Sequence, residues 1–204
     1  RTEAAELTMM GRLGYDAVTF GNHEFDYRSN GLSEMLISAV KNKEEDASLT
    51  LPMLLSANID WEKNKDQEDQ KLREAMELYG AKPYTILERN GVKIGIYGVL
   101  GQEAEDFAPE SGIDFDPIVD TSKKIVKELK DQGAEMIICL SHSGTNEDSS
   151  KSEDEELARK VPDIDVIISG HTHTKLEDYI KEGDTYIVSC GNYGESLGAV
   201  SYTH

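Results

Sequence analysis

Basic residues are scarce in this sequence of 204 residues. Its 21 Lys and Arg stand against 40 Asp and Glu, which gives a formal net charge of −19 with His taken as neutral. Binding to nucleic acids depends mainly on Lys and Arg side chains that neutralise phosphates, and no basic patch of that kind is visible. We therefore expect no nucleic-acid partner.

Long apolar runs are missing as well. None approaches the roughly 18 consecutive apolar residues that a membrane-spanning helix needs, so we exclude membrane insertion. The first residues lack the apolar stretch of a secretory signal peptide. Hydrophobic residues still make up 38% of the chain, which is enough for the packed core of one domain.

Cysteine is rare, with two residues in the chain. Cys139 and Cys190 each lie within a short apolar run. We predict that both are small buried hydrophobic side chains rather than metal ligands or parts of a disulfide framework.

Apolar runs alternate with segments of helical periodicity, which predicts an α/β domain with its sheet between layers of helices. The predicted helices cover residues 1–13, 31–41, 72–80, 117–132 and 153–160, and the predicted strands cover residues 15–20, 53–57, 84–88, 92–96, 136–140, 165–168, 186–190 and 197–202. Asn90 and Gly91 tolerate the positive φ angles of a tight turn and predict an antiparallel hairpin. The charged segment 59–70 is predicted to be a surface insertion.

Four of the five histidines closely follow predicted strands. His23 follows strand 15–20, His142 follows strand 136–140, and both His171 and His173 follow strand 165–168. In open α/β sheets, ligands bind beyond the carboxyl ends of the strands. If these strands are parallel, the imidazoles should meet at one edge of the sheet.

Small and polar residues surround these histidines in three turns, which read Gly21-Asn22-His23-Glu24, Ser141-His142-Ser143-Gly144 and Gly170-His171-Thr172-His173. Glycine permits a close approach that a Cβ would block. Imidazole nitrogen and Asn carbonyl oxygen are suitable ligands for Zn²⁺, Mn²⁺ or Fe²⁺. Each histidine alone could be an ordinary strand-end residue bonded to the backbone, but together the turns predict a transition-metal site.

The order of these motifs resembles that of the calcineurin-like metallophosphoesterases. Segments 14–26 and 190–198 resemble the branch of that superfamily that contains 5′-nucleotidases and UDP-sugar hydrolases. The resemblance spans essentially the whole chain. It implies a four-layer αββα sandwich of mixed sheets that holds two divalent ions (Zn, Mn, Fe or Co) and hydrolyses phosphate esters by attack of a metal-bound hydroxide.

The resemblance also implies metal ligands. Asn22, His142 and His171 would bind one ion, and His173 would belong to the other. The family pattern begins upstream with an Asp-x-His motif and a Gly-Asp motif, and neither occurs before Gly21. The Gly-Asp aspartate ordinarily bridges the ions, and two dications without it repel each other strongly. We therefore predict that this chain alone binds at most one metal tightly and is nearly inactive.

By the same resemblance, His23 would face the phosphate and the leaving oxygen without binding metal. Asp26 would hydrogen-bond and orient that imidazole, although it could instead cap the helix that begins near Ser29. We interpret Glu24 as a structural hydrogen-bond acceptor.

A run of acidic residues follows His142 closely and could be imagined to collect cations. It consists of Glu147, Asp148, Glu153, Asp154, Glu155 and Glu156. Acidic side chains at the start of a helix interact favourably with its dipole, so we predict a solvated helix face instead.

The first functional hypothesis is a 5′-nucleotidase that releases phosphate from nucleoside 5′-monophosphates. A 2′,3′-cyclic-nucleotide phosphodiesterase or a UDP-sugar hydrolase shares these motifs, and a catalytically dead remnant that acts as a binding module is an alternative of another class. The retained His23 and Asp26 oppose that remnant, since a pure scaffold would not need them.

The family resemblance implies an extracellular, cell-surface or periplasmic location. We expect residues 1–204 to form a single catalytic domain that is truncated at its N-terminus and lacks a C-terminal nucleotide-specificity domain. The sequence predicts no oligomeric state.

Overall fold

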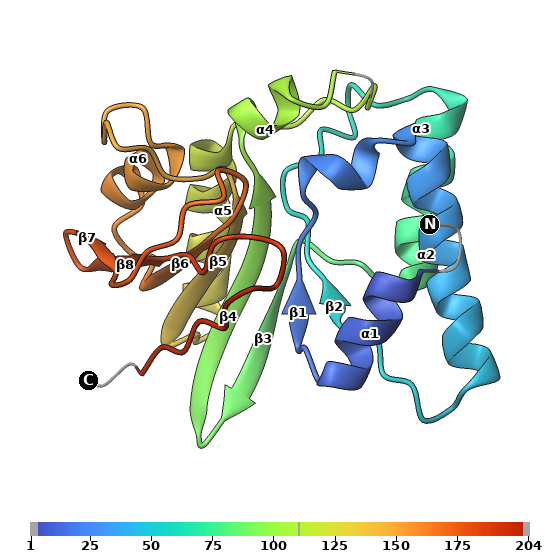
Figure 1. Cartoon of the computed structure of the whole chain (residues 1–204), viewed down its shortest axis with the longest axis horizontal. Coiled ribbons are helices and arrows are strands. Elements are labelled where there is room, and N and C mark those ends of the chain that lie inside the picture. Colours follow the sequence, from blue (N-terminus) through green and yellow to red (C-terminus); the bar gives the residue numbers. More distant parts are fainter. Residues whose placement is uncertain (1–3, 110, 202–204) are drawn as a thin grey trace.

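The computed structural model describes residues 4–109 and 111–201, with helices on both outer sides and strands between them (Figure 1). The helices are α1 (Ala5–Leu13), α2 (Arg28–Glu45), α3 (Gln67–Tyr79), α4 (Gln102–Asp106), α5 (Ile118–Asp131) and α6 (Glu153–Lys160), with a 3₁₀ turn η1 (Asn22–Phe25). The strands are β1 (Ala17–Val18), β2 (Met53–Leu54), β3 (Tyr84–Arg89), β4 (Val92–Leu100), β5 (Met136–His142), β6 (Val166–Ser169), β7 (Ile180–Glu182) and β8 (Thr185–Val188). Within the described residues, every helix is too short or too polar to cross a lipid bilayer.

Six strands form the main sheet in the order β3-β4-β5-β6-β8-β7. The four inner strands β4, β5, β6 and β8 run parallel, and β3 and β7 pair antiparallel at the two edges. Asn90 and Gly91 turn between β3 and β4 with φ angles of 53° and 81°, as a tight hairpin turn requires. The predicted α/β class and the predicted hairpin are both confirmed.

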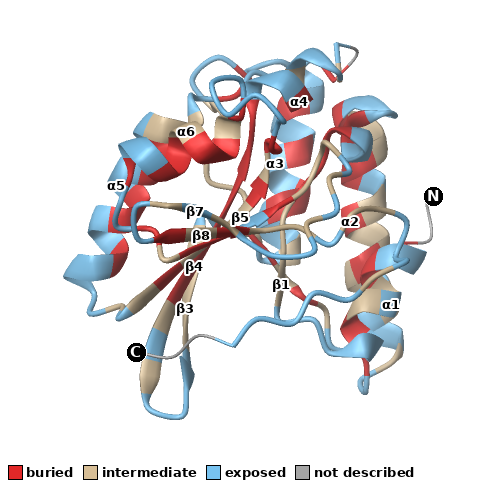
Figure 2. Cartoon of the chain, turned by 60° about the vertical axis from the view of Figure 1, so that its left-hand side comes forward, coloured by how far each residue is buried: buried red, intermediate tan, exposed pale blue. Residues whose placement is uncertain are grey.

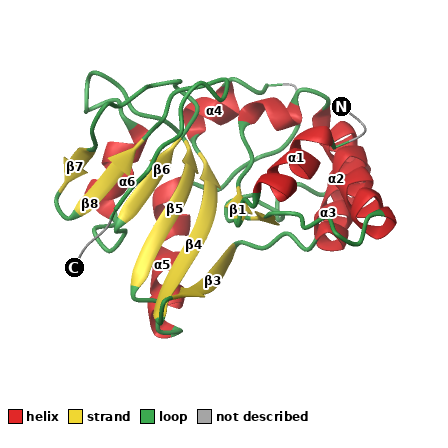
Figure 3. Cartoon of the chain, turned by 60° about the horizontal axis from the view of Figure 1, so that its bottom comes forward, coloured by secondary structure: helices red, strands yellow, loops and turns green. Residues whose placement is uncertain are grey.

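The second sheet is small and consists of the parallel strands β1 and β2. It lies between the main sheet and the helices α1, α2 and α3, while α5 and α6 cover the other face of the main sheet (Figures 1 and 3). The sheets approach each other at Gly98 of β4, where a Cβ would lie 2.3 Å from the carbonyl oxygen of Leu55. This order of layers confirms the four-layer αββα expectation.

Each half of the sandwich has its own apolar core (Figure 2). One core packs α2 and α3 together through side chains such as Leu36 and Leu72. The other packs α5 and α6 onto the main sheet through Leu129, Leu157 and Ile137. Burial of each such side chain contributes about 1.5–3 kcal/mol to the stability of the fold. The main sheet therefore holds the loops at its carboxyl edge in place.

Some predicted elements differ from the structure at the C-terminal end. The strand predicted at 197–202 is wrong for residues 197–201, which form no strand, and residue 202 lies outside the described residues. Leu197 is 91% exposed, so its apolar character reflects no buried position. The sequence pattern does not reveal β7, because its Lys181 and Glu182 obscure the apolar periodicity at a sheet edge. Cys139 is buried as predicted, whereas Cys190 is exposed.

The predicted strand 15–20 contracts to the two residues of β1, and segment 59–70 is not a simple surface insertion. Asn64 and Asp69 within it are buried. The Asn64 side chain bonds to the backbone of Asp114 at 2.8 and 3.0 Å. Asp69 and Asp66 form a capping box that starts α3 at Gln67. The high charge of the segment concealed these tertiary contacts.

Asn58 fixes the carboxyl end of β4. This side chain is fully buried, and its Nδ2 donates to the carbonyl oxygens of Leu100 at 2.8 Å and Asp116 at 2.9 Å. Its Oδ1 accepts from the Leu100 N–H at 3.0 Å. Because Leu100 pairs with His142 in the sheet, Asn58 also stabilises the edge at which β5 ends.

Replacement of Asn58 by Ala is expected to lower the free energy of unfolding by about 2–4 kcal/mol, because buried backbone groups lose their partners. Urea unfolding followed by circular dichroism would measure the loss. Asn146→Ala, at an exposed position, is the matched control and should change stability by less than about 0.5 kcal/mol. Equal losses for the two variants would contradict this assignment.

Candidate active site

Three segments meet beyond the carboxyl ends of β1, β5 and β6. Asn22 lies in η1 after β1, His142 is the last residue of β5, and His171 follows β6. Asn22 Oδ1 lies 2.9 Å from His142 Nε2, and the ring centroids of His142 and His171 are 5.2 Å apart. The structure thus brings together three of the four side chains that the sequence predicted as metal ligands.

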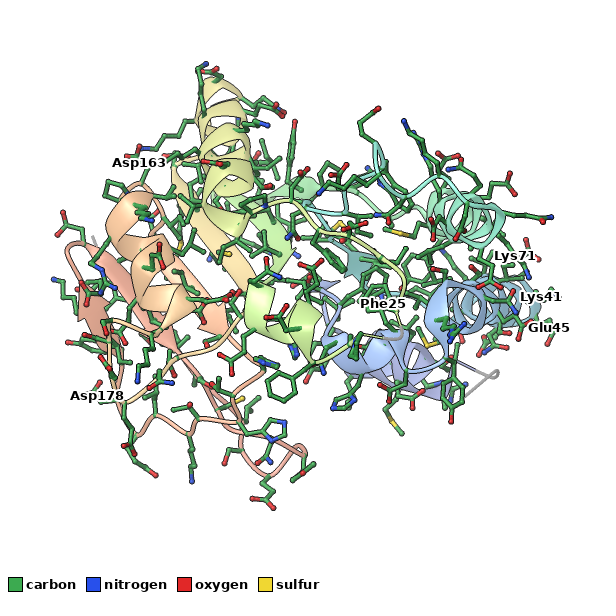
Figure 4. The ribbon with its side chains drawn as sticks, turned by 90° about the horizontal axis from the view of Figure 1, so that it is seen from above. Phe25, Lys41, Glu45, Lys71, Asp163 and Asp178 are labelled. Atoms are coloured by element: carbon green, nitrogen blue, oxygen red, sulfur yellow. The ribbon has the colours of Figure 1, made fainter. Side chains whose placement is uncertain are left out.

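Aromatic packing and a hydrogen bond hold the turn η1 in place. Phe25, labelled in Figure 4, is 1% exposed and packs edge-on against Phe20 and Phe115 with centroid distances of 5.7 and 5.6 Å. Glu24 Oε2 accepts a hydrogen bond from the Gly21 N–H at 2.7 Å, which confirms its predicted structural role. Residues 22 and 23 are therefore presented from a fixed turn.

Two glycines make room for the ring of His142. A Cβ at Gly21 would lie 2.7 Å from His142 Cε1, and a Cβ at Gly170 would lie 3.1 Å from His142 Nδ1. Any other residue at Gly21 would force the ring to move, because 2.7 Å is far inside van der Waals contact. The space that the His142 ring occupies therefore explains why a glycine precedes Asn22 and another precedes His171.

The imidazoles of His142 and His171 are held in the neutral form. The pKa of His142 falls to about 4, chiefly because burial disfavours its charged form, and the positive charges of His171, His23 and His173 act in the same direction. Burial also lowers the pKa of His171, although the negative charge of Glu103 opposes this shift. Near pH 7 both rings keep a lone pair available for a cation.

His23 and Asp26 form a pair at the rim of the site. His23 Nδ1 lies 3.1 Å from Asp26 Oδ1 and 3.3 Å from its Oδ2, and the His23 side chain is 72% exposed. Tyr27, not Asp26, occupies the N-cap position of α2. This geometry disfavours the alternative that Asp26 caps the helix.

His173 contacts Asn192 and Tyr193. Its Nδ1 lies 3.2 Å from Asn192 Nδ2, and its ring centroid is 5.5 Å from that of Tyr193. Within residues 4–109 and 111–201, no three His, Cys, Asp or Glu side chains form a group that could hold a metal ion. Two imidazoles and an amide oxygen are suitable ligands for a divalent ion, whereas the described residues around His173 include no group of three His, Cys, Asp or Glu side chains that could hold one.

Several side chains beside these histidines carry no individual signal in the sequence. Asn192 and Tyr193 lie next to His173, and Phe107, which is 68% exposed, has its ring centroid 5.7 Å from that of His171. Segment 190–198 resembles a family motif only as a whole, and Phe107 lies in no recognised motif. Exposed loop residues carry no periodicity, so only tertiary structure reveals such neighbours.

The prediction that the acidic run 147–156 is a solvated face is wrong for two of its members. Asp154 is 0% exposed and Glu155 is 5% exposed. The physical reason for Asp154 is a hydrogen bond from the Ser141 hydroxyl, with Ser141 Oγ 2.6 Å from Asp154 Oδ1. Its carboxylate thus faces the strands rather than the solvent.

A family model described as calcineurin-like phosphoesterase matches residues 2–175 of the sequence. The chain belongs to the calcineurin-like phosphoesterase family. Members of this family use divalent metal ions, and the neutral imidazoles of this phosphoesterase chain suit that chemistry.

Relatives of this phosphoesterase include nucleotide hydrolases. The trifunctional nucleotide phosphoesterase protein YfkN of Bacillus subtilis is 34% identical over 96% of this chain and 14% of its own length. The probable 5′-nucleotidase of Treponema pallidum is 33% identical over 85% of this chain and 25% of its own length. The chain thus spans a quarter or less of these two curated relatives.

A solved structure supports the fold independently. The 5′-nucleotidase precursor from Thermus thermophilus matches this phosphoesterase with a TM-score of 0.71 at 24% identity, over 94% of this chain and 36% of that chain. The similarity extends over both halves of the sandwich, and it therefore includes the elements that carry the site.

The metal-free phosphoesterase chain is expected to lose stability as the pH falls from about 7 toward 4. The pKa of His142 is about 4 in the folded chain against 6.5 as its ordinary value, so the unfolded chain binds more protons in that window. This group should remove about 2 kcal/mol of unfolding free energy between pH 7.5 and pH 5.

Urea unfolding with EDTA at both pH values would measure the loss of unfolding free energy. His142→Gln should abolish the part of this loss that comes from protonation of His142. The carboxyl groups contribute equally in the unsubstituted chain and in the His142→Gln variant. The difference between the two pH profiles of stability therefore gives the contribution of His142. Parallel profiles would contradict the low pKa of His142.

Proposed function

We propose that this chain forms the catalytic site of a metal-dependent hydrolase that releases phosphate from nucleoside 5′-monophosphates. The observation that carries the proposal is the convergence of Asn22, His142 and His171 beside the His23–Asp26 pair. Similarity to the probable 5′-nucleotidase of Treponema pallidum and to a snake venom 5′-nucleotidase supports this substrate class.

Asn22 Oδ1, His142 Nε2 and a ring nitrogen of His171 would hold the divalent ion. The neutral state of the two imidazoles and the amide oxygen of Asn22 fit Zn, Mn, Fe or Co. When bound, such an ion lowers the pKa of water and neutralises charge on phosphoryl oxygens. His173 would belong to a second ion, which needs further ligands.

His23 and Asp26 would act on the ester itself. Asp26 holds the Nδ1 side of the His23 ring, so the other nitrogen, Nε2, faces the phosphate ester. In the cationic form, His23 stabilises the charge of the phosphoryl group. As the phosphoryl group is transferred to water and the ester P–O bond breaks, His23 gives its proton to the departing ester oxygen, which leaves as the nucleoside hydroxyl. This proton transfer contributes roughly 10²–10⁴-fold to the rate.

The location and the organisation of the molecule are further parts of the proposal. The relatives named snake venom 5′-nucleotidases are 34% identical to this chain, and they support an extracellular, cell-surface or periplasmic location. Residues 1–204 are proposed as one catalytic domain, with nucleotide specificity supplied by any further domain of the polypeptide that contains it.

Titration of the metal-free chain with Mn²⁺ or Zn²⁺ is expected to reveal one tight site per chain, because Asn22, His142 and His171 lie together. The described residues include no group of three His, Cys, Asp or Glu side chains for a second ion. His142→Ala should weaken that binding by at least about tenfold, since it removes a central ligand. Isothermal calorimetry would measure stoichiometry and affinity, and phosphate release from AMP by the 204-residue chain should stay close to background.

The control for this titration is Asp184→Asn, which removes an exposed carboxylate in the turn between β7 and β8 and should leave the affinity unchanged. Two equally tight sites would contradict the single-ion proposal. The absence of any bound Mn²⁺ or Zn²⁺ would favour the non-catalytic binding module instead.

In the longest natural polypeptide that contains this chain, His23→Ala is expected to lower kcat for AMP by about 10²–10⁴-fold. Metal content should stay nearly constant because His23 is not a ligand. Phosphate release and metal analysis measure the two effects separately, and Tyr27→Phe at an exposed neighbouring position serves as the control.

A simultaneous loss of metal from the His23 variant would show that His23 is a ligand. The same polypeptide should attack neither 2′,3′-cyclic AMP nor UDP-glucose at a comparable rate. Faster turnover of either compound than of AMP would overturn the 5′-nucleotidase assignment in favour of the corresponding alternative.

A further inference from the structure

We infer that Asp154 is a positioning residue that holds His142 and His171 in their relative placement from the helix side of the main sheet. The significance of this placement for catalysis rests on the proposed function. The inference itself concerns two loops and can be tested without turnover.

The carboxylate of Asp154 is attached directly to the end of β5. Asp154 lies in the first turn of α6 and is 0% exposed. The Ser141 hydroxyl donates to Asp154 Oδ1 at 2.6 Å, and Ser143 Oγ lies 2.8 Å from Ser141 Oγ. Because the single hydroxyl hydrogen of Ser141 goes to the carboxylate, Ser141 accepts from Ser143. The residue after Ser141 is His142.

The same carboxylate also faces the end of β6. Ser169 pairs with Ser141 across the two strands, and both serines are buried. Burial raises the pKa of Asp154 to about 6, and the Ser169 hydroxyl shifts it in the opposite direction. Ser169 Oγ and Asp154 Oδ2 are both buried and have no hydrogen-bond partner among the described residues. His171 follows Ser169 by two residues.

Further hydrogen bonds tie the two loops to each other. The Asp154 N–H donates to the Gly144 carbonyl oxygen at 3.2 Å, and the Gly170 N–H donates to the Ser141 carbonyl oxygen at 2.8 Å. The Thr145 N–H donates to Thr172 Oγ1 at 3.2 Å. A shift at Asp154 therefore reaches both loops through bonded contacts.

Capping of α6 does not account for this arrangement. Ser152 already occupies the N-cap position, and its hydroxyl accepts from the Glu155 N–H. An acidic residue that served only the helix dipole would remain at the surface, where its charge is solvated. Complete burial of the Asp154 carboxylate is costly unless hydrogen bonds compensate, and its side-chain bond to Ser141 goes to the strand.

The test uses the metal-free 204-residue chain and the variants Asp154→Ala, Asp154→Asn and Ser141→Ala. In ¹H–¹³C NMR spectra, Asp154→Ala and Ser141→Ala should shift the ring signals of both His142 and His171. Asp154→Asn keeps an acceptor oxygen for Ser141 and should leave these signals nearly in place. Mn²⁺ affinity should fall about 10–100-fold for the two Ala variants and less than about threefold for Asp154→Asn.

Thr185→Ala is the matched control for a lost buried hydrogen bond. Thr185 is fully buried, and its Oγ1 donates to the Ile164 carbonyl oxygen at 2.7 Å near the amino ends of β6 and β8. This variant should lose stability without any shift of the two ring signals. If Asp154→Ala does not fold, Ser141→Ala carries the same test.

Unchanged ring signals in Asp154→Ala or in Ser141→Ala would overturn the inference, and so would equal shifts in Thr185→Ala. If the unsubstituted chain binds no Mn²⁺ while the ring signals still move in the two Ala variants, the positioning role is supported and the proposed metal site is refuted. The failure of one proposal is thus distinguishable from the failure of the other.

Discussion

Parallel pairing between β5 and β6 is the constraint on which the rest of the site depends. The register places Ser141 opposite Ser169, so the two strands deliver His142 and His171 at neighbouring points of one edge. A slip of one residue would turn every side chain of β6 to the other face. It would remove Ser169 from the helix side and carry the His171 loop away from Asn22. The apolar core under α5 and α6 therefore contributes to the geometry of the site as well as to stability.

His142 and His23 differ in how far their rings are exposed to solvent. His142 is half-buried between two glycines, where the cost of desolvation favours a neutral ring. His23 lies at the exposed rim beside the Asp26 carboxylate. The chain as a whole carries a charge of −19, which attracts cations and repels a nucleotide phosphate. Attraction of a phosphate must therefore be local, and in the proposed function it comes from the bound ion and His23.

Sequence reasoning was strongest where local pattern and tertiary placement coincide. Histidines after apolar runs predict a sheet edge, and the Asn90–Gly91 turn is determined by two residues. Predictions from sequence were wrong where the burial of a polar side chain depends on a hydrogen-bond partner far away in the chain. Asp154 stands in an acidic run that is typical of a solvated helix start, and only the Ser141 hydroxyl across the layer explains why it is buried. The burial of Asn64, in a charged segment, escapes prediction for the same reason.

Two residues at the edge that carries the histidines have unfavourable backbone conformations. His171 and His173 have φ angles of 78° and 56°, in the left-handed region, and such residues cost of order 1–3 kcal/mol each when the backbone is strained. The buried Asp154 carboxylate in the first turn of α6 and the desolvated His142 ring at the end of β5 add to this cost. A scaffold kept only for its fold would gain stability if these features relaxed, since substitutions that remove strain are readily found. The arrangement is therefore better explained by a requirement for ligand geometry than by one for stability, which favours the catalytic proposal over a binding remnant.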